Sequence, residues 1–286
     1  MLPLFVTMSR RLWTFVSLTL LSLAAASAFF KIYGASIKFK NSPTLAVNDS
    51  GTWRSVDKGI EYRKMTLERS DTGQIIDLKL IRFDTRWIVP RIVRSEQYQL
   101  AGANVKTLAL KSGAVAAINA NYFDEKRKPL GFLKTGGAEI NRNVSKSSLF
   151  TGVFAVRASS PFIIHRDEFQ SQQADEALQS GPLLLYRGSA VEMTRGINRY
   201  SRRTILGIDR EQRIVIAVTD ALLGGLSWAE LQELFSSPRW QLQTPDLLNL
   251  DGGGSAQLYL KTATLEEMIL GTSEVPVAVG FFVKAN

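Results

Sequence analysis

Pairs of short apolar runs joined by polar turns are the feature that most limits how this chain can fold. The clearest pair is residues 204–208 and 213–219, and a second pair is residues 60–67 and 75–83. Runs of this length with turn residues between them are typical of antiparallel strands. Further hairpins are expected to turn at Gly136 and Gly137 and at Ser159 to Pro161, so the sequence predicts a sheet assembled largely from hairpins.

Helix signals are few and local. Ser227 and Glu230 have the S-x-x-E spacing of a capping box, which predicts a helix beginning after Ser227. A second helix is expected over residues 105–111, ending at Gly113. We therefore expect an α+β fold: a single domain with a largely antiparallel or mixed sheet and a few packed helices.

The N-terminus indicates export. Arg10 and Arg11 precede an uncharged run, residues 12–30, which contains small residues near its end. This pattern is typical of a signal peptide, and its length also allows an uncleaved membrane anchor that tethers the protein through residues 12–30. The expected location is periplasmic or extracellular. The predicted organisation is a signal peptide or membrane anchor over 1–30, a linker over 31–52 and one domain over 53–286.

Composition excludes several kinds of chemistry. The chain of 286 residues has no cysteine and a single histidine, His165, so it holds no thiol nucleophile, no cysteine zinc site and no HExxH motif. The net charge of +9 suits anionic or phosphate-bearing partners. The basic residues are scattered rather than gathered in a stripe, and nucleic acid is therefore not expected as a partner.

The segment from Asn249 to Ser255 is the sharpest chemical feature. Asp251 ends an apolar strand and is followed by Gly252, Gly253 and Gly254. Successive glycines permit close approach to the backbone, and their N–H groups can form a concavity that binds anions. We predict that Asp251 is catalytic and that Gly252, Gly253, Gly254 and Ser255 contact the substrate; the alternative is a flexible turn between strands.

Other polar residues at strand ends complete the predicted site. Asp220 follows residues 213–219 and is the candidate second carboxylate of an acid/base pair with Asp251. Arg203 is a candidate for phosphate neutralisation and Arg202 for substrate binding, because a guanidinium offers a planar fork of donors. The remaining candidates are Asn119, Asn121 and Asp124, which suit either sugar hydroxyls or a cation, although their spacing matches no established metal loop.

Five motifs, taken in order, resemble the phosphodiester glycosidase domain family, whose members include exported bacterial proteins linked to exopolysaccharide. They are AAINANYFD (116–124), SGPLLLYRG (180–188), SRRTILGID (201–209), GGLSWAELQELF (224–235) and NLDGGGSAQLYL (249–260). The chain departs from the family at residues 119–123, where many members have Asn-Gly-Gly-Phe-Phe and this chain has Asn-Ala-Asn-Tyr-Phe. The resemblance implies a site that gathers Asn119, Asp124, Arg203, Asp220 and the 251–255 loop.

The resemblance also implies hydrolysis of a sugar-phosphate diester at the anomeric carbon, with a phosphorylated glycan of the envelope or exopolysaccharide type as substrate. No cofactor is required by the sequence, and assistance by a divalent cation stays open, as does the oligomeric state. The main alternative is a non-catalytic phosphoglycan-binding protein that uses the same loops. A third hypothesis, a hydrolase with Ser255 as nucleophile, has an incomplete G-x-S-x-G motif and only His165 as a base.

Overall fold

A computed structural model of the chain describes residues 37–38, 44–193 and 196–284. The export segment predicted over residues 1–30 lies outside the described residues. Within the described part, no helix is both long and apolar enough to cross a membrane. The chain divides into two compact units, Met1–Ile37 and Lys38–Asn286, and the architecture below is that of the second.

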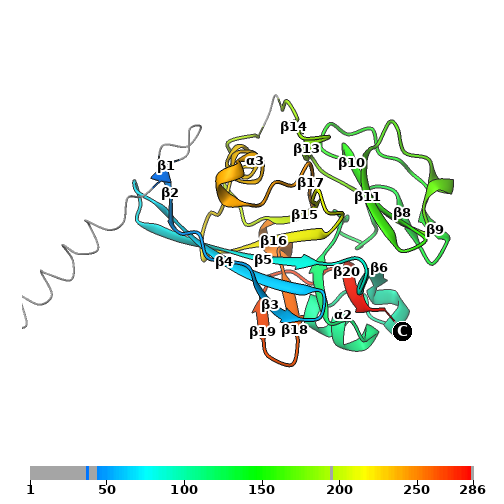
Figure 1. Ribbon diagram of the computed structural model, residues 1–286. Coiled ribbons are helices and arrows are strands. Elements are labelled where there is room, and N and C mark those ends of the chain that lie inside the picture. The colour runs from blue at the N-terminus through cyan, green and yellow to red at the C-terminus, as the bar shows by residue number, and fades with distance from the viewer. Residues whose placement is uncertain (1–36, 39–43, 194–195, 285–286) are drawn as a thin grey trace, which may run out of the picture. The chain divides into compact units, whose positions relative to one another are not determined.

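The largest sheet is antiparallel throughout and is built around hairpins (Figure 1). After the two-residue strand β1 (Ile37–Lys38), its order is β2 (Leu45–Asp49), β4 (Ile60–Arg69), β5 (Gln74–Phe83), β16 (Ile214–Asp220), β15 (Thr204–Ile208), β17 (Asp246–Asn249), β13 (Leu183–Tyr186) and β14 (Ser189–Ala190), with β3 (Arg54–Asp57) paired to β4. The predicted hairpins β4–β5 and β15–β16 are confirmed.

Two further antiparallel sheets complete the body. One has the order β11 (Ser160–His165), β10 (Gly152–Arg157), β12 (Glu176–Ser180), β8 (Leu133–Thr135) and β9 (Ala138–Asn141). The other has the order β19 (Glu266–Ile269), β18 (Leu258–Lys261), β7 (Ala116–Asn119), β20 (Val277–Val283) and β6 (Ile88–Arg94). The hairpins expected at Gly136 and at Ser159 are confirmed as β8–β9 and β10–β11.

The predicted α+β class is wrong, because the described residues form three antiparallel sheets and only two α helices. These are α2 (Val105–Ser112) and α3 (Trp228–Ser236); four short 3₁₀ turns, η1 (Ser95–Tyr98), η2 (Ser171–Gln173), η3 (Pro238–Trp240) and η4 (Gly253–Ser255), complete the list. The fold is β-rich because most of the apolar runs are four to ten residues long and end in turns, so they pair as strands.

Both predicted helices form where their local signals lie. The hydroxyl of Ser227 accepts a hydrogen bond from the Glu230 N–H, and the Glu230 carboxylate accepts one from the Ser227 N–H, which completes the capping box of α3. The helix α2 ends at Gly113, whose φ of 77° is left-handed. These contacts span only a few residues, which is why the sequence was sufficient to predict them.

The predicted linker over residues 31–52 needs correction at its C-terminal end. Strand β2 pairs with β4 inside that range, and Leu45, Ala46 and Val47 are buried. A polar, turn-rich composition concealed this short strand, because only three of its five residues face the core. The folded body therefore begins before residue 53.

One hydrophobic core joins the three sheets. Phe83 of β5 stacks on Phe281 of β20 with ring centroids 4.1 Å apart, so the first sheet packs directly on the third. Phe154 of β10 and Leu183 of β13 belong to the same buried cluster, which connects the second sheet. This shared core fixes the ends of strands from different sheets beside one another, and the site described below lies at such a junction.

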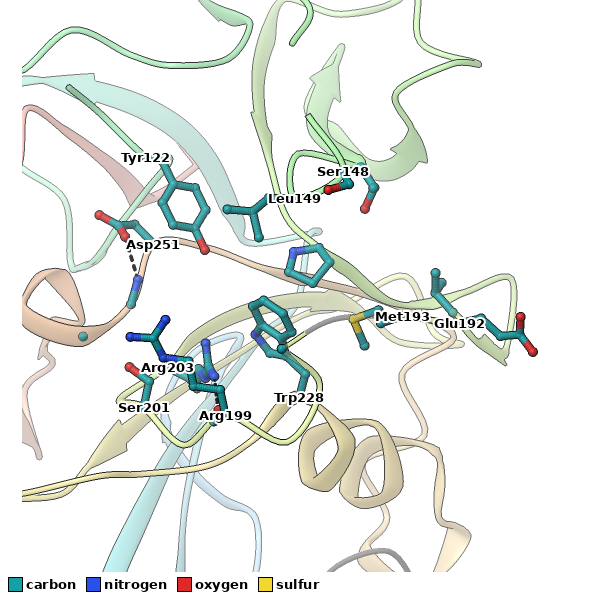
Figure 2. Close-up of a pocket in the computed structure, with 16 residues that line it drawn as sticks. Tyr122, Ser148, Leu149, Glu192, Met193, Arg199, Ser201, Arg203, Trp228 and Asp251 are labelled. Atoms are coloured by element: carbon teal, nitrogen blue, oxygen red, sulfur yellow. Dashed lines mark hydrogen bonds between the residues drawn. The ribbon is translucent and has the colours of Figure 1, made fainter. Parts of the chain in front are cut away.

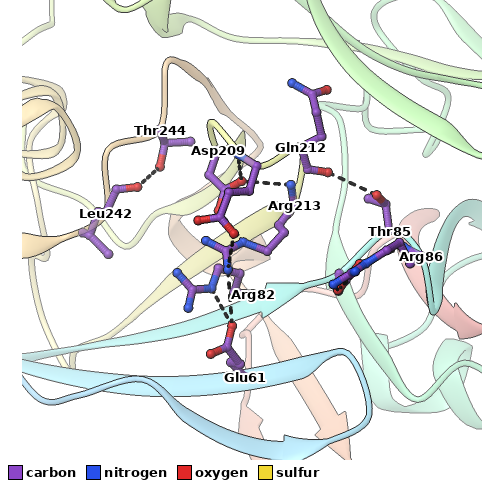
Figure 3. A network of polar contacts seen from close by, with 11 residues as sticks. Glu61, Arg82, Thr85, Arg86, Asp209, Gln212, Arg213, Leu242 and Thr244 are labelled. Atoms are coloured by element: carbon purple, nitrogen blue, oxygen red, sulfur yellow. Dashed lines mark hydrogen bonds and ion pairs between the residues drawn. The ribbon is translucent and has the colours of Figure 1, made fainter.

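Polar contacts fix the turn of the β15–β16 hairpin to the neighbouring hairpin (Figure 3). Within the turn, Arg213 Nε donates to Asp209 Oδ2 at 2.8 Å, and the Arg213 Nη1 is 3.9 Å from Glu61 Oε2. Glu61 of β4 also accepts from Arg82 Nε of β5 at 2.7 Å. This network fixes the β15–β16 turn against β4 and β5. The turn lies at the opposite end of β15 from the polar loop that follows β17.

Candidate active site

Asp251 is held at the point where strands from two sheets end. It follows the buried strand β17, and its N–H donates to the carbonyl of Ala120 at 3.0 Å, just beyond β7. The Asn119 side chain donates from Nδ2 to the Asp251 carbonyl at 2.7 Å. These two contacts join the loop after β17 to the end of β7, so the backbone on either side of the Asp251 side chain is fixed.

The Asp251 carboxylate is partly buried and hydrogen-bonded. It accepts from the N–H of Gly252 at 2.9 Å and from the hydroxyl of Ser255. Burial is the largest influence and raises the pKa of Asp251, while the hydrogen bonds from Ser255 and Gly252 act in the opposite direction. A carboxylate whose pKa is raised in this way is a stronger base than an ordinary surface aspartate.

The three glycines after Asp251 are required by the structure, two by close packing and one by its backbone conformation. A Cβ on Gly252 would lie 2.6 Å from the carbonyl oxygen of Arg202, and one on Gly254 would lie 2.6 Å from Thr272 Oγ1. Gly253 has a left-handed φ of 58° and donates its N–H to the Arg202 carbonyl at 2.9 Å. The predicted anion-binding concavity of glycine N–H groups is therefore wrong for Gly252 and Gly253, whose N–H groups already have acceptors within the chain.

Asp251 opens onto a pocket of about 820 Å³ (Figure 2). Figure 2 shows Asp251 and Tyr122 on one wall, with Arg203, Arg199 and Trp228 across from them. The described residues that line the pocket are Tyr122, Ser148, Leu149, Thr151, Pro182, Val191, Glu192, Met193, Gly196, Arg199, Ser201, Arg203, Trp228, Asp251, Gly252 and Gly253. A cavity of this size accommodates a small ligand, and it combines an apolar side with a few charged groups.

Arg203 is the buried cation of this pocket. Its Nε donates to the carbonyl of Leu226 at 2.9 Å and its Nη2 donates to the carbonyl of Arg199, while its guanidinium lies 4.8 Å from the ring centre of Trp228. Burial lowers the pKa of Arg203 to about 10, so the side chain stays charged at neutral pH. Neither Arg203 nor Arg199 forms an ion pair with a carboxylate among the residues that the structure describes.

Tyr122 places a phenol beside Asp251. Its hydroxyl accepts from Asn249 Nδ2 at 3.1 Å and lies 3.2 Å from the carbonyl oxygen of Gly181 and 3.3 Å from that of Leu250. Burial, followed by the charge of Asp251, raises the pKa of Tyr122 above its usual range. The phenol therefore stays protonated and joins the Asp251 loop to the segment that leads into β13.

Asp220 is not part of this pocket, which contradicts its predicted pairing with Asp251. It forms an ion pair with Lys79 Nζ at 3.1 Å and lines a separate cavity of about 420 Å³. The preceding residue, Thr219, is buried and accepts a hydrogen bond from the Arg203 N–H at 2.6 Å. Because consecutive side chains of a strand point to opposite faces, Thr219 faces the site and Asp220 faces away from it.

Most of the other predicted residues support the loop instead of lining the pocket. Asn119 is fully buried and its Oδ1 accepts from Thr204 Oγ1 at 2.6 Å and from the N–H of Gln257 at 3.0 Å. Arg202 donates from Nη2 to two backbone carbonyls, those of Ala256 and Leu270, so it anchors the chain beneath the glycines. Ser255 is buried and bonded to Asp251, an arrangement unlike that of an exposed serine nucleophile.

Two predicted substrate contacts lie outside the pocket. Asp124 closes a local turn, in which its Oδ1 accepts from the Lys128 N–H at 2.8 Å. Asn121 is buried, and its Nδ2 donates to the Tyr122 carbonyl at 3.2 Å. Over the described ranges, no three carboxylate or histidine side chains gather in a way that could hold a metal ion.

The pocket also contains residues that the sequence analysis did not single out. Tyr122 lies inside the AAINANYFD motif, at a position where the chain departs from the family, and Trp228 lies in the predicted helix. The signal that would have found Trp228 is its place as the first residue after the capping serine, where the helix start meets the strand-end loops. Arg199 has no local signal, because the loop that contains it is ordinary in composition.

Comparisons with known proteins identify the family and the fold. The phosphodiester glycosidase family matches residues 112–284. The catalytic domain of zebrafish N-acetylglucosamine-1-phosphodiester α-N-acetylglucosaminidase, auto-inhibited by its pro-peptide, is similar in fold, with 16% identity, a TM-score of 0.59, and coverage of 87% of this chain and 86% of that one. No curated protein sequence matches the chain significantly.

Two further solved structures share the fold. A hypothetical protein from Synechocystis is 15% identical with a TM-score of 0.58, and the alignment covers 82% of this chain but only 64% of that one. A protein from Burkholderia pseudomallei that is proposed to be exported is 10% identical with a TM-score of 0.52, covering 74% of this chain and 75% of that one. The family match spans the strands and loops that carry Tyr122, Arg203 and Asp251, and the chain belongs to the phosphodiester glycosidase family.

Proposed function

We propose that this protein hydrolyses a sugar-phosphate diester at the anomeric carbon of the sugar. The observation that carries the proposal is one pocket that holds the partly buried carboxylate of Asp251 together with Arg203 and Arg199, neither of which forms an ion pair with a carboxylate of the described residues. The arginines suit the negative charge of a phosphodiester, and Asp251 suits the positive charge that develops on the sugar.

In the proposed reaction, the bond between the anomeric carbon and the phosphate oxygen breaks, and its electron pair leaves with the phosphate. A water molecule adds to the anomeric carbon and gives up a proton to Asp251. A phosphate is a good leaving group when its charge is neutralised, so Arg203 and Arg199 take the place of a strong general acid. This division of work needs one carboxylate, which agrees with the position of Asp220 outside the pocket.

The compartment and substrate class belong to the same proposal. Arg10, Arg11 and the apolar run over residues 12–30 favour export to the periplasm or beyond the cell, with either a cleaved signal or a retained anchor. The Burkholderia pseudomallei protein of similar fold is itself proposed to be exported. A phosphorylated glycan of the envelope or exopolysaccharide type is the substrate we expect there.

The test is hydrolysis of a panel of sugar phosphodiesters by the full chain and by two matched variants. Asp251→Asn should lower turnover about 100- to 10,000-fold, the range expected for loss of a general base. Asp220→Asn changes the same kind of side chain outside the pocket and should retain most of the activity. Equal losses in both variants, or none in Asp251→Asn, would contradict the assignment of Asp251.

Two further measurements complete the test. Each assay is run with and without a chelator, and turnover that disappears with the chelator would show that a divalent cation assists. Tight binding of a phosphoglycan that persists in Asp251→Asn, without any product from the unmodified chain, would favour the alternative of a non-catalytic binding protein.

A further inference from the structure

Two consecutive leucines project into solvent from the loop between β16 and α3. The exposed fraction is 96% for Leu222 and 75% for Leu223, the two highest values among the large apolar side chains of the described residues. We call residues 221–225 the dileucine loop. A single exposed leucine is ordinary, but two adjacent leucines at the tip of one loop form an apolar surface that water solvates poorly.

A neighbouring strand contacts the dileucine loop. The side chain of Gln74, at the start of β5, donates from Nε2 to the carbonyl of Leu223, so the two segments touch. The next residue, Ile75, is 50% exposed. Because consecutive side chains of a strand point to opposite faces, Ile75 lies on the other face from Gln74, and the apolar tip consists of Leu222 and Leu223.

The base of the dileucine loop is firmly attached to the fold. Arg69 Nη2 donates to the Gly225 carbonyl at 2.8 Å. Leu226, which follows the loop, exchanges two backbone hydrogen bonds with Ser201, a residue that lines the pocket. The loop is thus held in a defined position by the same backbone that forms one wall of the candidate active site.

The described body also begins at this end of the sheet. Ser70, at the tip of the β4–β5 hairpin, donates its N–H to the carbonyl of Thr44 at 2.7 Å. The other side of the same tip is Gln74, which contacts Leu223. The chain that precedes residue 44 therefore enters the body beside the dileucine loop.

The sequence before that entry point contains the apolar run over residues 12–30. Residues 31–43 separate it from Thr44, and a fully extended chain of this length reaches at most about 47 Å. If the run remains in a bilayer, this tether keeps the entry end of the body close to the lipid surface. The exposed leucines are then on the end of the body that the tether holds nearest to the membrane.

We propose that Leu222 and Leu223 insert into a lipid surface and orient the body on it. Leucine side chains lower their free energy by leaving water for the acyl boundary, which accounts for their placement at a loop tip attached by its base. The contact would present the pocket wall that contains Ser201 towards the membrane. It requires no particular reaction in the pocket and is independent of the proposed hydrolysis.

The absence of cysteine allows a direct test in the full chain. A single Leu223→Cys substitution is labelled with an environment-sensitive fluorophore, and the protein is reconstituted into vesicles of phosphatidylcholine and phosphatidylglycerol with or without nitroxide-labelled acyl chains. The matched control is Leu110→Cys. Leu110 is 59% exposed and lies on α2, a helix that packs on the third sheet. We expect a blue shift and acyl-chain quenching at position 223 and neither at position 110.

A second experiment measures the contribution of the leucines themselves. With the probe at Ala221→Cys, in the same loop, the Leu222→Ser/Leu223→Ser variant should lower the equilibrium constant for insertion roughly 100-fold, because burial of each leucine contributes about tenfold. Absence of acyl-chain quenching at position 223 would overturn the proposal. A blue shift without such quenching would also overturn it and would indicate that another protein surface covers the loop.

Discussion

The ion pair between Arg69 of β4 and Glu230 of α3 offers the sharpest test of how this fold is held together. Arg69 Nη1 and Nη2 donate to Glu230 Oε1 and Oε2 at 2.9 and 3.0 Å, and the two side chains are 4% and 1% exposed. Glu230 also accepts from the Ser227 N–H at 2.8 Å, and Arg69 lies 3.7 Å from the ring centre of Tyr200. One carboxylate therefore neutralises a buried guanidinium and caps a helix.

We predict that Glu230→Gln lowers the free energy of unfolding by about 3–5 kcal/mol. The substitution keeps the size of the side chain but leaves the charge of Arg69 without its carboxylate, and removing one partner of a buried ion pair costs about 3–5 kcal/mol. The amide of the variant keeps one oxygen acceptor, but its NH2 group must face the guanidinium, so at least one charge-assisted hydrogen bond, worth about 1.5–3 kcal/mol, is lost along with the charge. The stacking of Tyr200 on Arg69 is retained in the variant and does not enter the difference.

The assay is urea unfolding of the full chain, followed by the fluorescence of its five tryptophans. The matched control is Glu168→Gln, which breaks the pair of Glu168 and Arg187, whose side chains are 43% and 70% exposed. That exposed pair should contribute at most about 1 kcal/mol. A loss in Glu230→Gln no larger than the loss in the control would refute the reasoning.

Four further outcomes follow from the site. Burial raises the pKa of Asp251, so turnover should increase with pH as that carboxyl ionises. The acidic limb of the pH–rate profile should lie above the pH range in which an ordinary aspartate ionises. An acidic limb at the usual carboxyl pKa would count against Asp251 as the base. Asp251 binds its proton more tightly in the native state than in the unfolded chain, so its contribution to stability falls as pH rises through the folded-state pKa. Asp251→Asn should therefore leave the free energy of unfolding at neutral pH unchanged or higher, which urea titration measures. Tyr122→Phe removes a hydroxyl that contacts Asn249, and we expect lower turnover with a loss of stability of about 1–3 kcal/mol; unchanged values of both would show that the phenol is dispensable. Gly252→Ala would place a methyl group 2.6 Å from the Arg202 carbonyl, so activity should fall steeply while Gly73→Ala, at an open turn, retains it.

The local structure of this protein was predictable because it depends on residues close in sequence. The capping box of Ser227 and Glu230 and the end of α2 at Gly113 are satisfied within one helical turn. The β15–β16 hairpin closes over a few residues, so alternating apolar runs and turn residues were enough to predict it. The family could be recognised for the same reason, since its motifs are contiguous stretches of sequence.

The composition of the candidate site depends on long-range pairing instead. Tyr122, Arg203 and Trp228 face Asp251 because β7, β15 and α3 meet at one junction, and no local pattern encodes that meeting. Short apolar runs show that strands exist, but not which strands become neighbours across more than a hundred residues. The α+β class is wrong for a different reason: the two predicted helices form, but they are small parts of a body built from three antiparallel sheets.

Asp220 and Asp251 show where the division between sequence and tertiary structure lies. The sequence determined that both carboxylates stand at strand ends before loops that contain glycines, and therefore that each was a reasonable candidate. Only the tertiary structure decides which face of β16 is turned towards the pocket. Thr219 contacts Arg203 on that face, and Asp220 therefore lies on the opposite face. Strand position is a property of the local chain, whereas the face that becomes a site is fixed by the packing of sheets that are distant in sequence.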